Sequence, residues 1–276
     1  METAPALPLI VEPGELESNL GTPHLLVVDL SRPEVHQQLH VPGAMYLDYG
    51  ALVAARPPVA GLLPDAEHLT AVMSTLAVTP DTHVVAYDDE GGGKAGRLLW
   101  TLDAVGHHRW SLLNGGLHAW ANEGHPTAVD IVEPEPRRRD VTIHPDFVAD
   151  ADWIMARLAD PAVACLDSRA PDEFSGTRRY SARGGHIPGA VNMDWVRAMD
   201  PARNLRLRPA PELLEELAAL GVVPDKEVVV YCQTHHRSSH TYVMLKALGF
   251  DRVRGYHGAW SEWGNRDDTP VEVETR

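Results

Sequence analysis

The sequence predicts an α/β protein with two similar domains, each a mostly parallel sheet covered by helices on both faces. Short apolar runs alternate with helix-like patterns, which is typical of parallel sheets. Motifs of the first half recur in the second half in the same order. Hydrophobic residues make up 44% of the 276 residues, enough for a sizeable core in each half.

Four pairs of segments carry the repeat. Their residues are 27–32 with 165–169, 40–44 with 186–190, 84–88 with 228–232, and 115–120 with 256–260. The period of roughly 140 residues is far longer than that of solenoid repeats and indicates a duplicated domain. Two prolines and a charge run near the middle suit an exposed connection. We therefore predict a domain over residues 1–130, a linker over 131–145 and a second domain over 146–276.

The strands and helices follow from hydrophobic periodicity. Buried strands are expected at residues 25–29, 84–87, 163–166 and 228–231, and helices at 98–105, 213–220 and 242–248. Pro211 suits a first helical turn, and Gly221 and Gly249 suit helix ends. In parallel sheets, ligands bind beyond the carboxyl ends of strands. Cys232 directly follows the last predicted strand, which places it at such an edge.

Composition excludes several classes of protein. The net charge of −15 argues against nucleic-acid binding, which needs a basic face. The N-terminus has no basic segment before an apolar one, and no apolar run is long enough to span a membrane. With two cysteines only, disulfides do not organise the fold. A reducing cytoplasm is the expected location, because it would keep a reactive thiol reduced.

The loop after the strand 228–231 is the main candidate site. It carries a cysteine, two histidines and an arginine ahead of a predicted helix, as Cys232, Gln233, Thr234, His235, His236, Arg237 and Ser238. Backbone N–H groups of such a loop can converge on an anion, and the helix dipole adds to their effect. Cationic neighbours lower a thiol pKa from ~8.5 to somewhere between about 3.5 and 7.5. The loop therefore predicts a nucleophilic thiolate at Cys232.

These motifs together resemble the rhodanese superfamily. The His-Ile-Pro-Gly-Ala segment, the Val-Val-Val-Tyr-Cys strand and the Gly-Ala-Trp segment carry the resemblance, which covers nearly the whole chain. The tandem arrangement, with Asp88 where the second copy has Cys232, is similar to two-domain thiosulfate sulfurtransferases. The loop itself is similar to that of Azotobacter-type bacterial rhodaneses. The resemblance implies two rhodanese-like domains, a non-catalytic one over residues 1–130 and a catalytic one over residues 146–276.

The resemblance also implies a reaction, in which Cys232 takes the outer sulfur of thiosulfate, or of another small anionic sulfur donor, as a persulfide. Cyanide or a thiol then accepts the sulfur, with ping-pong kinetics. No cofactor, metal, nucleic acid or membrane is implied. The donor 3-mercaptopyruvate and a role as persulfide carrier are the alternatives. The loop Cys-Gln-Thr-His-His-Arg differs from the usual loops of both thiosulfate and mercaptopyruvate enzymes.

Further substrate contacts are expected around the loop. The six loop residues after Cys232, from Gln233 to Ser238, can donate hydrogen bonds to an anion. The family places an arginine from the region before residue 186 over the substrate. Arg178, Arg179 and Arg183 all lie there, and we rank Arg179 and Arg183 first. Trp195 is expected to line the pocket.

Other interpretations of these residues remain open. Cys232, His235, His236 and His240 are metal-ligand types, although a single short loop would be a cramped site. A cysteine phosphatase would also need a basic loop, but its usual spacing has one residue more between cysteine and arginine. Outside the loop, the residues expected to be structural are the thiol Cys165, the turn residue His186, and Trp100, Trp110, Trp120, Trp260 and Trp263.

Overall fold

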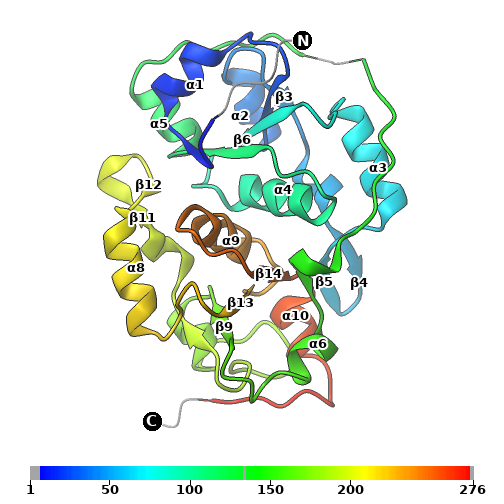
Figure 1. Cartoon of the computed structure of the whole chain (residues 1–276), viewed down its shortest axis with the longest axis vertical. Helices are drawn as coiled ribbons and strands as arrows, with labels where there is room; N and C mark the ends of the chain where they lie inside the picture. Colours follow the sequence, from blue (N-terminus) through cyan, green and yellow to red (C-terminus); the bar gives the residue numbers. More distant parts are fainter. Residues whose placement is uncertain (1–6, 133–134, 274–276) are drawn as a thin grey trace. The chain divides into compact units, whose positions relative to one another are not determined.

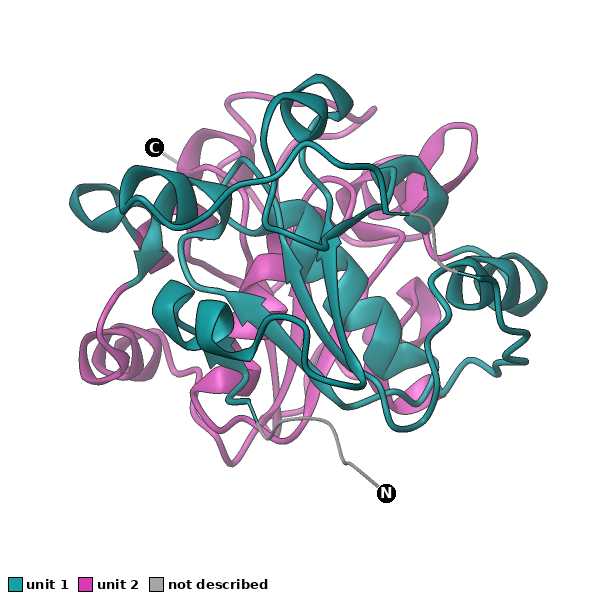
Figure 2. Ribbon diagram, turned by 90° about the horizontal axis from the view of Figure 1, so that it is seen from above, with its two compact units in different colours: residues 1–52, 64–144, 200–207 teal, residues 53–63, 145–199, 208–276 magenta. Residues whose placement is uncertain are grey.

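The computed structural model describes residues 7–132 and 135–273, which form two compact units (Figure 1). Figure 2 colours them separately: unit 1 takes the described parts of 1–52, 64–144 and 200–207, and unit 2 those of 53–63, 145–199 and 208–276. Each unit thus includes a short segment from the other repeat. The predicted linear division at residues 130 and 146 does not anticipate this exchange. Residues 133 and 134 of the predicted linker lie outside the described residues.

Unit 1 contains one parallel sheet and its helices. The elements are β1 (Ile10–Val11), α1 (Pro13–Asn19), β2 (Leu25–Asp29), α2 (Pro33–Gln38), β3 (Met45–Tyr46), the 3₁₀ helix η1 (Tyr49–Leu52), α3 (Ala66–Thr75), β6 (His83–Tyr87), α4 (Gly93–Ala104), β7 (Trp110–Leu113) and α5 (Gly116–Asn122). The strand order is β1-β7-β6-β2-β3.

Unit 2 repeats this plan and adds a hairpin, β4 (Ala54–Arg56) and β5 (Val59–Leu62). Its other elements are η2 (Pro145–Phe147), β8 (Val148–Ala149), α6 (Ala151–Met155), β9 (Val163–Asp167), α7 (Pro171–Phe174), β10 (Val191–Asn192), η3 (Trp195–Ala198), α8 (Ala210–Ala219), β13 (Glu227–Tyr231), α9 (Arg237–Ala247), β14 (Val253–Tyr256) and α10 (Ala259–Trp263). Residues 199–207, where the chain passes from unit 2 into unit 1, form β11 (Met199–Asp200), η4 (Pro201–Arg203) and β12 (Arg206–Leu207).

The two main sheets have the same topology. The order β10-β9-β13-β14-β8 in unit 2 matches β3-β2-β6-β7-β1 in unit 1, and all pairings in both sheets are parallel. The predicted α/β fold with two mostly parallel sheets is therefore confirmed. β13 lies between β9 and β14, so its carboxyl end opens at the middle of the sheet edge. That edge is where Cys232 begins the loop.

Side chains alternate between the two faces of each sheet, as the strand period requires. In unit 2, Val229 and Tyr231 belong to a core cluster with residues of α6, α7 and α10. Helix α9 contacts β13 and β14. The five tryptophans that we expected to be structural, Trp100, Trp110, Trp120, Trp260 and Trp263, are all buried. Within the described residues, no helix combines the length and the apolar character needed to cross a bilayer.

The same tyrosine anchors the Pro-Gly-Ala motif in each unit. Tyr87 and Tyr231 end their central strands, and their hydroxyl oxygens accept hydrogen bonds from the backbone N–H of Val41 (3.0 Å) and Ile187 (3.2 Å). Both tyrosines are buried. The repeated tyrosine and repeated motif therefore form one structural unit, which explains why both copies contain them although only one has the cysteine.

Candidate active site

The candidate site is the loop between β13 and α9. Cys232 leaves the strand with only 1% of its surface exposed, and α9 begins at Arg237. His235 has a left-handed backbone (φ 54°), which is uncommon for a residue with a side chain. Its carbonyl oxygen accepts a hydrogen bond from Ser239 Oγ at 2.5 Å, and its Nδ1 lies 2.8 Å from Ser238 Oγ. These bonds within the loop stabilise a tight turn around the sulfur.

The sulfur of Cys232 lies among hydrogen-bond donors. The hydroxyl and backbone N–H of Ser238 and the backbone N–H of Thr234 donate to it. Burial alone would raise the thiol pKa, but the charge of Arg237 and these donors outweigh burial, so the pKa of Cys232 is below that of an ordinary thiol. The arrangement favours a thiolate, as the sequence predicts.

Arg237 does more than close the loop. Its two terminal nitrogens, Nη1 and Nη2, donate to Oε2 and Oε1 of Glu173 at 2.6 and 2.9 Å. Glu173 lies on α7, and its side chain is only 3% exposed. Sequence reasoning missed Glu173, because no pattern relates a carboxylate on α7 to an arginine 64 positions further along the chain.

The hairpin β4–β5 contacts the loop from within unit 2. Gly61 has φ +79°, and a Cβ there would lie 2.1 Å from the carbonyl oxygen of Thr234, so only glycine fits. Ser261 Oγ donates to the carbonyl of Ala60 at 2.8 Å, and the backbone N–H of Ser261 donates to the carbonyl of Gln233 at 2.9 Å. A segment of the first repeat thus supports the loop of the second, which no motif in the sequence indicates.

The three candidate arginines have different environments. The guanidinium of Arg183 donates to the carbonyls of Trp263, Arg266 and Thr269. Arg183 therefore stabilises the turn after α10, and its role in substrate binding stays a prediction. Arg179 is exposed on the loop after α7. Its role in binding stays a prediction.

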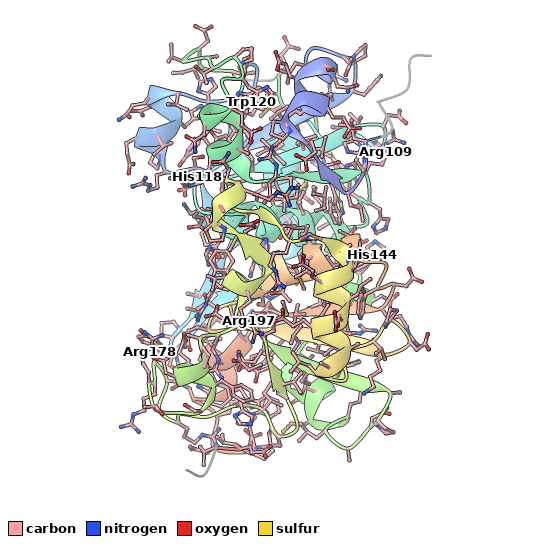
Figure 3. All side chains as sticks on the ribbon, turned by 90° about the vertical axis from the view of Figure 1, so that its left-hand side faces the viewer. Arg109, His118, Trp120, His144, Arg178 and Arg197 are labelled. Carbon is pink, nitrogen blue, oxygen red and sulfur yellow. The ribbon has the colours of Figure 1, made fainter. Side chains whose placement is uncertain are left out.

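Arg178, which we ranked below the other two, is the one connected to the loop. Its Nη2 lies 3.0 Å from Oδ1 of Asp172 and 3.4 Å from Oε2 of Glu173, the partner of Arg237. The side chain is 47% exposed and lies at the surface of unit 2 (Figure 3). Arg178 and Arg237 therefore share the carboxylate of Glu173.

Trp195 lies beside the first turns of α9. Its ring centroid is 5.9 Å from that of His236 and 5.6 Å from that of His240. His240 is buried, and burial with the nearby His236 lowers its pKa to about 4. A neutral, buried His240 belongs to the packing behind the loop. The role of Trp195 against substrate stays a prediction.

In the described part of the chain, no three His, Cys, Asp or Glu side chains come together in a group that could hold a metal ion. Cys165 packs against the core, and burial together with Asp167 raises its pKa to about 12, which fits an unreactive structural thiol. His186 stacks on Phe174 with centroids 3.7 Å apart and bonds to its carbonyl through Nδ1 at 2.9 Å. Both residues are structural, as expected.

One alignment within the repeat needs correction. The backbone N–H of Leu117 donates to the carbonyl of Asp88, and that of Trp260 donates to the carbonyl of Cys232. Leu117 and Trp260 are therefore equivalent, and Trp120 corresponds to Trp263, not to Trp260. Both segments contain an Ala-Trp pair, but the pair lies three residues later in α5 than in α10, so the sequence alone suggests the wrong alignment.

Comparison with known proteins gives a consistent result. The Rhodanese-like domain family matches residues 12–123 and 150–266. The chain is 45% identical to the thiosulfate sulfurtransferase of Pseudomonas aeruginosa, over 97% of this chain and 98% of that protein. It is 44% identical to the thiosulfate sulfurtransferase of Azotobacter vinelandii, over 99% of this chain and 100% of that protein.

The solved structure of YnjE supports the fold alone. It superposes with a TM-score of 0.86 at 23% identity, and the match covers 97% of this chain and 69% of that one. The likeness extends across both repeats.

Proposed function

The chain belongs to the rhodanese family, and we propose that it is a thiosulfate sulfurtransferase whose nucleophile is Cys232. The observation that carries this proposal is a single buried sulfur that receives three hydrogen bonds and lies under the charge of Arg237. Nearly full-length identity of 44–45% to thiosulfate sulfurtransferases supports the substrate.

In the first half-reaction, the Cys232 thiolate attacks the outer sulfur of thiosulfate. A new S–S bond forms, the S–S bond of thiosulfate breaks, and sulfite leaves with the bonding electrons. The enzyme then carries Cys–S–S⁻. The lowered pKa of Cys232 favours the thiolate, so the mechanism assigns no separate base.

In the second half-reaction, a thiophilic acceptor attacks the outer sulfur of the persulfide. With cyanide the product is thiocyanate, and the electrons of the broken S–S bond return to Cys232 as thiolate. A thiol acceptor would give a persulfide of its own. The donors around Cys232 stabilise both anionic forms of the enzyme, which is the role we assign to this loop.

The remaining loop residues would bind the donor and the outer sulfur. Backbone N–H groups of the loop residues Gln233, Thr234, His235, His236 and Ser238 offer uncharged donors. Arg237 and the exposed Arg179 offer positive charge, and Trp195 an apolar wall. Small anions suit this combination, because a guanidinium and converging amides together bind oxyanions.

Intact mass after incubation with thiosulfate tests the proposal. We expect one added sulfur on the wild-type protein and none on Cys232→Ser. Steady thiocyanate production separates an enzyme from a persulfide carrier, which would load once and stop. Kinetics with thiosulfate and 3-mercaptopyruvate side by side identify the preferred donor. An unmodified mass in the presence of excess thiosulfate would refute the proposal.

We further propose that the first repeat, predicted over residues 1–130, is non-catalytic and that the protein works in the cytoplasm. The first repeat has Asp88 at the position of Cys232. A reducing compartment would return Cys232 to a free thiol after each accidental oxidation. The overall charge of −15 fits a protein with no nucleic-acid partner.

A further inference from the structure

We propose that Glu173 is a positioning residue for sulfur transfer: it fixes the Arg237 guanidinium in the orientation in which that group faces Cys232 and the donor anion. The inference rests on the proposed function of Cys232 and extends it to a residue outside the loop. Glu173 touches neither the sulfur nor the substrate in this mechanism, and acts only through Arg237.

The contact has the geometry of a strong ion pair. Two parallel N–H···O bonds, of 2.6 and 2.9 Å, join the planar guanidinium to both carboxylate oxygens. Such bidentate pairs fix orientation as well as distance. The side chains of Arg237 and Glu173 are 21% and 3% exposed, so solvent screens the pair little.

Glu173 is itself held in place. It is the third residue of the short helix α7, and its Oε2 also accepts from the backbone N–H of Ala170 at 3.4 Å. Burial would raise its pKa, but Arg237 and then the nearby Arg169 outweigh burial, so the pKa of Glu173 is below its ordinary value. The carboxylate therefore stays charged at neutral pH, with its orientation set before any substrate binds.

The pair leaves Arg237 able to act on a ligand. A guanidinium carries five N–H donors, and Glu173 takes two of them. The other three remain for an anion. A flexible arginine loses side-chain entropy when it binds an oxyanion, and prior fixation by Glu173 reduces that loss.

The first repeat provides an internal control. Helices α2 and α7 both begin with a proline, four residues after the equivalent Asp29 and Asp167, so Val35 occupies the position of Glu173. Ala95 donates its N–H to Asp88 as Ser238 does to Cys232, so Lys94 occupies the position of Arg237. The copy without the cysteine therefore has valine in place of Glu173 and lysine in place of Arg237, and these two residues cannot form a bidentate pair. A pair needed only for folding would not be expected to vanish together with the nucleophile.

The charges of the pair also predict in which direction the thiol pKa of Cys232 changes when Glu173 is replaced. Arg237 favours the thiolate of Cys232, whereas the negative charge of Glu173 opposes it. Removing that charge should therefore lower the thiol pKa, while transfer becomes slower because the guanidinium is no longer fixed. A residue with a purely structural role would not produce these two opposite effects.

The test uses the full chain with Glu173→Gln, which keeps the size of the side chain and removes its charge. We expect the thiol pKa of Cys232, read from the pH dependence of iodoacetamide alkylation, to fall. We expect kcat/KM for thiosulfate to fall about 10- to 100-fold, the range that loss of orientation produces. Glu216→Gln is the matched control, since Glu216 is also paired with arginines in unit 2, and it should change neither value.

A double-mutant cycle with Arg237→Lys sharpens the test. Lysine keeps the charge but cannot form the bidentate pair. If the two residues act as a unit, the double variant should be no worse than the more impaired single variant, within about threefold. Independent effects that multiply would overturn the proposal.

Other outcomes are equally decisive. Glu173→Gln with an unchanged or raised thiol pKa and full kcat/KM would overturn the proposal. Should that variant not fold, Glu173→Asp keeps the charge on a shorter arm, and we expect an unchanged thiol pKa with reduced kcat/KM. The alkylation measurement needs no sulfur donor. A wild-type protein that fails to load sulfur would therefore refute the proposed function without changing the result for Glu173.

Discussion

The loops after β6 and β13 occupy the same place in the two units but hold different anions. In unit 1 the anion is the side chain of Asp88. Its Oδ1 accepts from the backbone N–H groups of Glu90 (3.0 Å) and Gly92 (2.8 Å), and its Oδ2 from that of Ala95 (2.9 Å). In unit 2 the corresponding donors surround the sulfur of Cys232. The first loop is therefore filled by its own carboxylate, and the second is built around an anion that can react.

The charges near each loop strengthen this difference. Asp89 and Glu90 follow Asp88, and burial together with Glu90 raises the pKa of Asp88. The cation that follows the loop is Arg237 in unit 2 and Lys94 in unit 1, where Lys94 is paired with Asp89 and Glu90. We propose that converging amides and a nearby cation are not sufficient for catalysis, and that a reactive sulfur facing an arginine is what the second copy adds.

The largest expected effect comes from removing the reactive anion itself. Cys232→Ser keeps the size of the side chain but leaves a hydroxyl that stays protonated at neutral pH. We expect thiocyanate formation to fall by at least about 10⁴-fold, as when other enzymes lose their nucleophile. Thermal unfolding of the variant should match that of the wild type. Substantial residual transfer would mean that the two loops do not differ in the way proposed.

The second prediction compares the two cysteines of unit 2. The pKa of Cys232 is lowered, so its alkylation rate should rise with pH to a plateau below ~8.5, the ordinary thiol value. With a pKa of about 12, Cys165 is ionised at pH 7 to a fraction of only about 10⁻⁵. Peptide mapping after brief iodoacetamide treatment at pH 7 should find label at Cys232 only. Equal labelling would contradict the assigned environments.

The third prediction transplants the sulfur into the other loop. Asp88→Cys places a thiol among the equivalent amides but next to Asp89 and Glu90, and the cation at the position of Arg237 is Lys94, which is paired with those two carboxylates. We expect this thiol to be alkylated at pH 7 at least about tenfold more slowly than Cys232. Combined with Cys232→Ser, it should restore no sulfur transfer. Restored transfer would show that the backbone N–H groups of the loop are sufficient to make a cysteine active in sulfur transfer.

The sequence predicted the elements that repeat and missed those that depend on distant contacts. The strand 228–231 was predicted within one residue of β13, because a β-branched run in a buried strand is a local signal. The helix predicted at 98–105 begins earlier, at Gly93, because its first turn is small and polar and gives no apolar period.

The contacts at the site that the sequence does not reveal have a common physical reason. Cys232 and its loop were evident, since the nucleophile and its cation lie in one segment. Glu173, Gly61 and the turn-stabilising role of Arg183 arise from folding of segments far apart in the chain. No periodicity or motif encodes these contacts, which depend on how distant segments pack in the folded chain.

The smallest expected effect on turnover comes from removing the carboxylate of Asp88 from the loop after β6. Asp88→Ala leaves the N–H groups of Glu90, Gly92 and Ala95 without their carboxylate acceptor. A buried donor left without a hydrogen-bond partner lowers the free energy of unfolding by about 1–3 kcal/mol. We expect a lower midpoint of chemical denaturation, while kcat/KM for thiosulfate stays within about twofold of wild type, because this loop binds no substrate. Asp88→Asn keeps an acceptor oxygen and should lose less stability. A large loss of turnover in a fully folded Asp88→Ala protein would mean that the first loop takes part in catalysis, and the division of labour between the two copies would then be wrong.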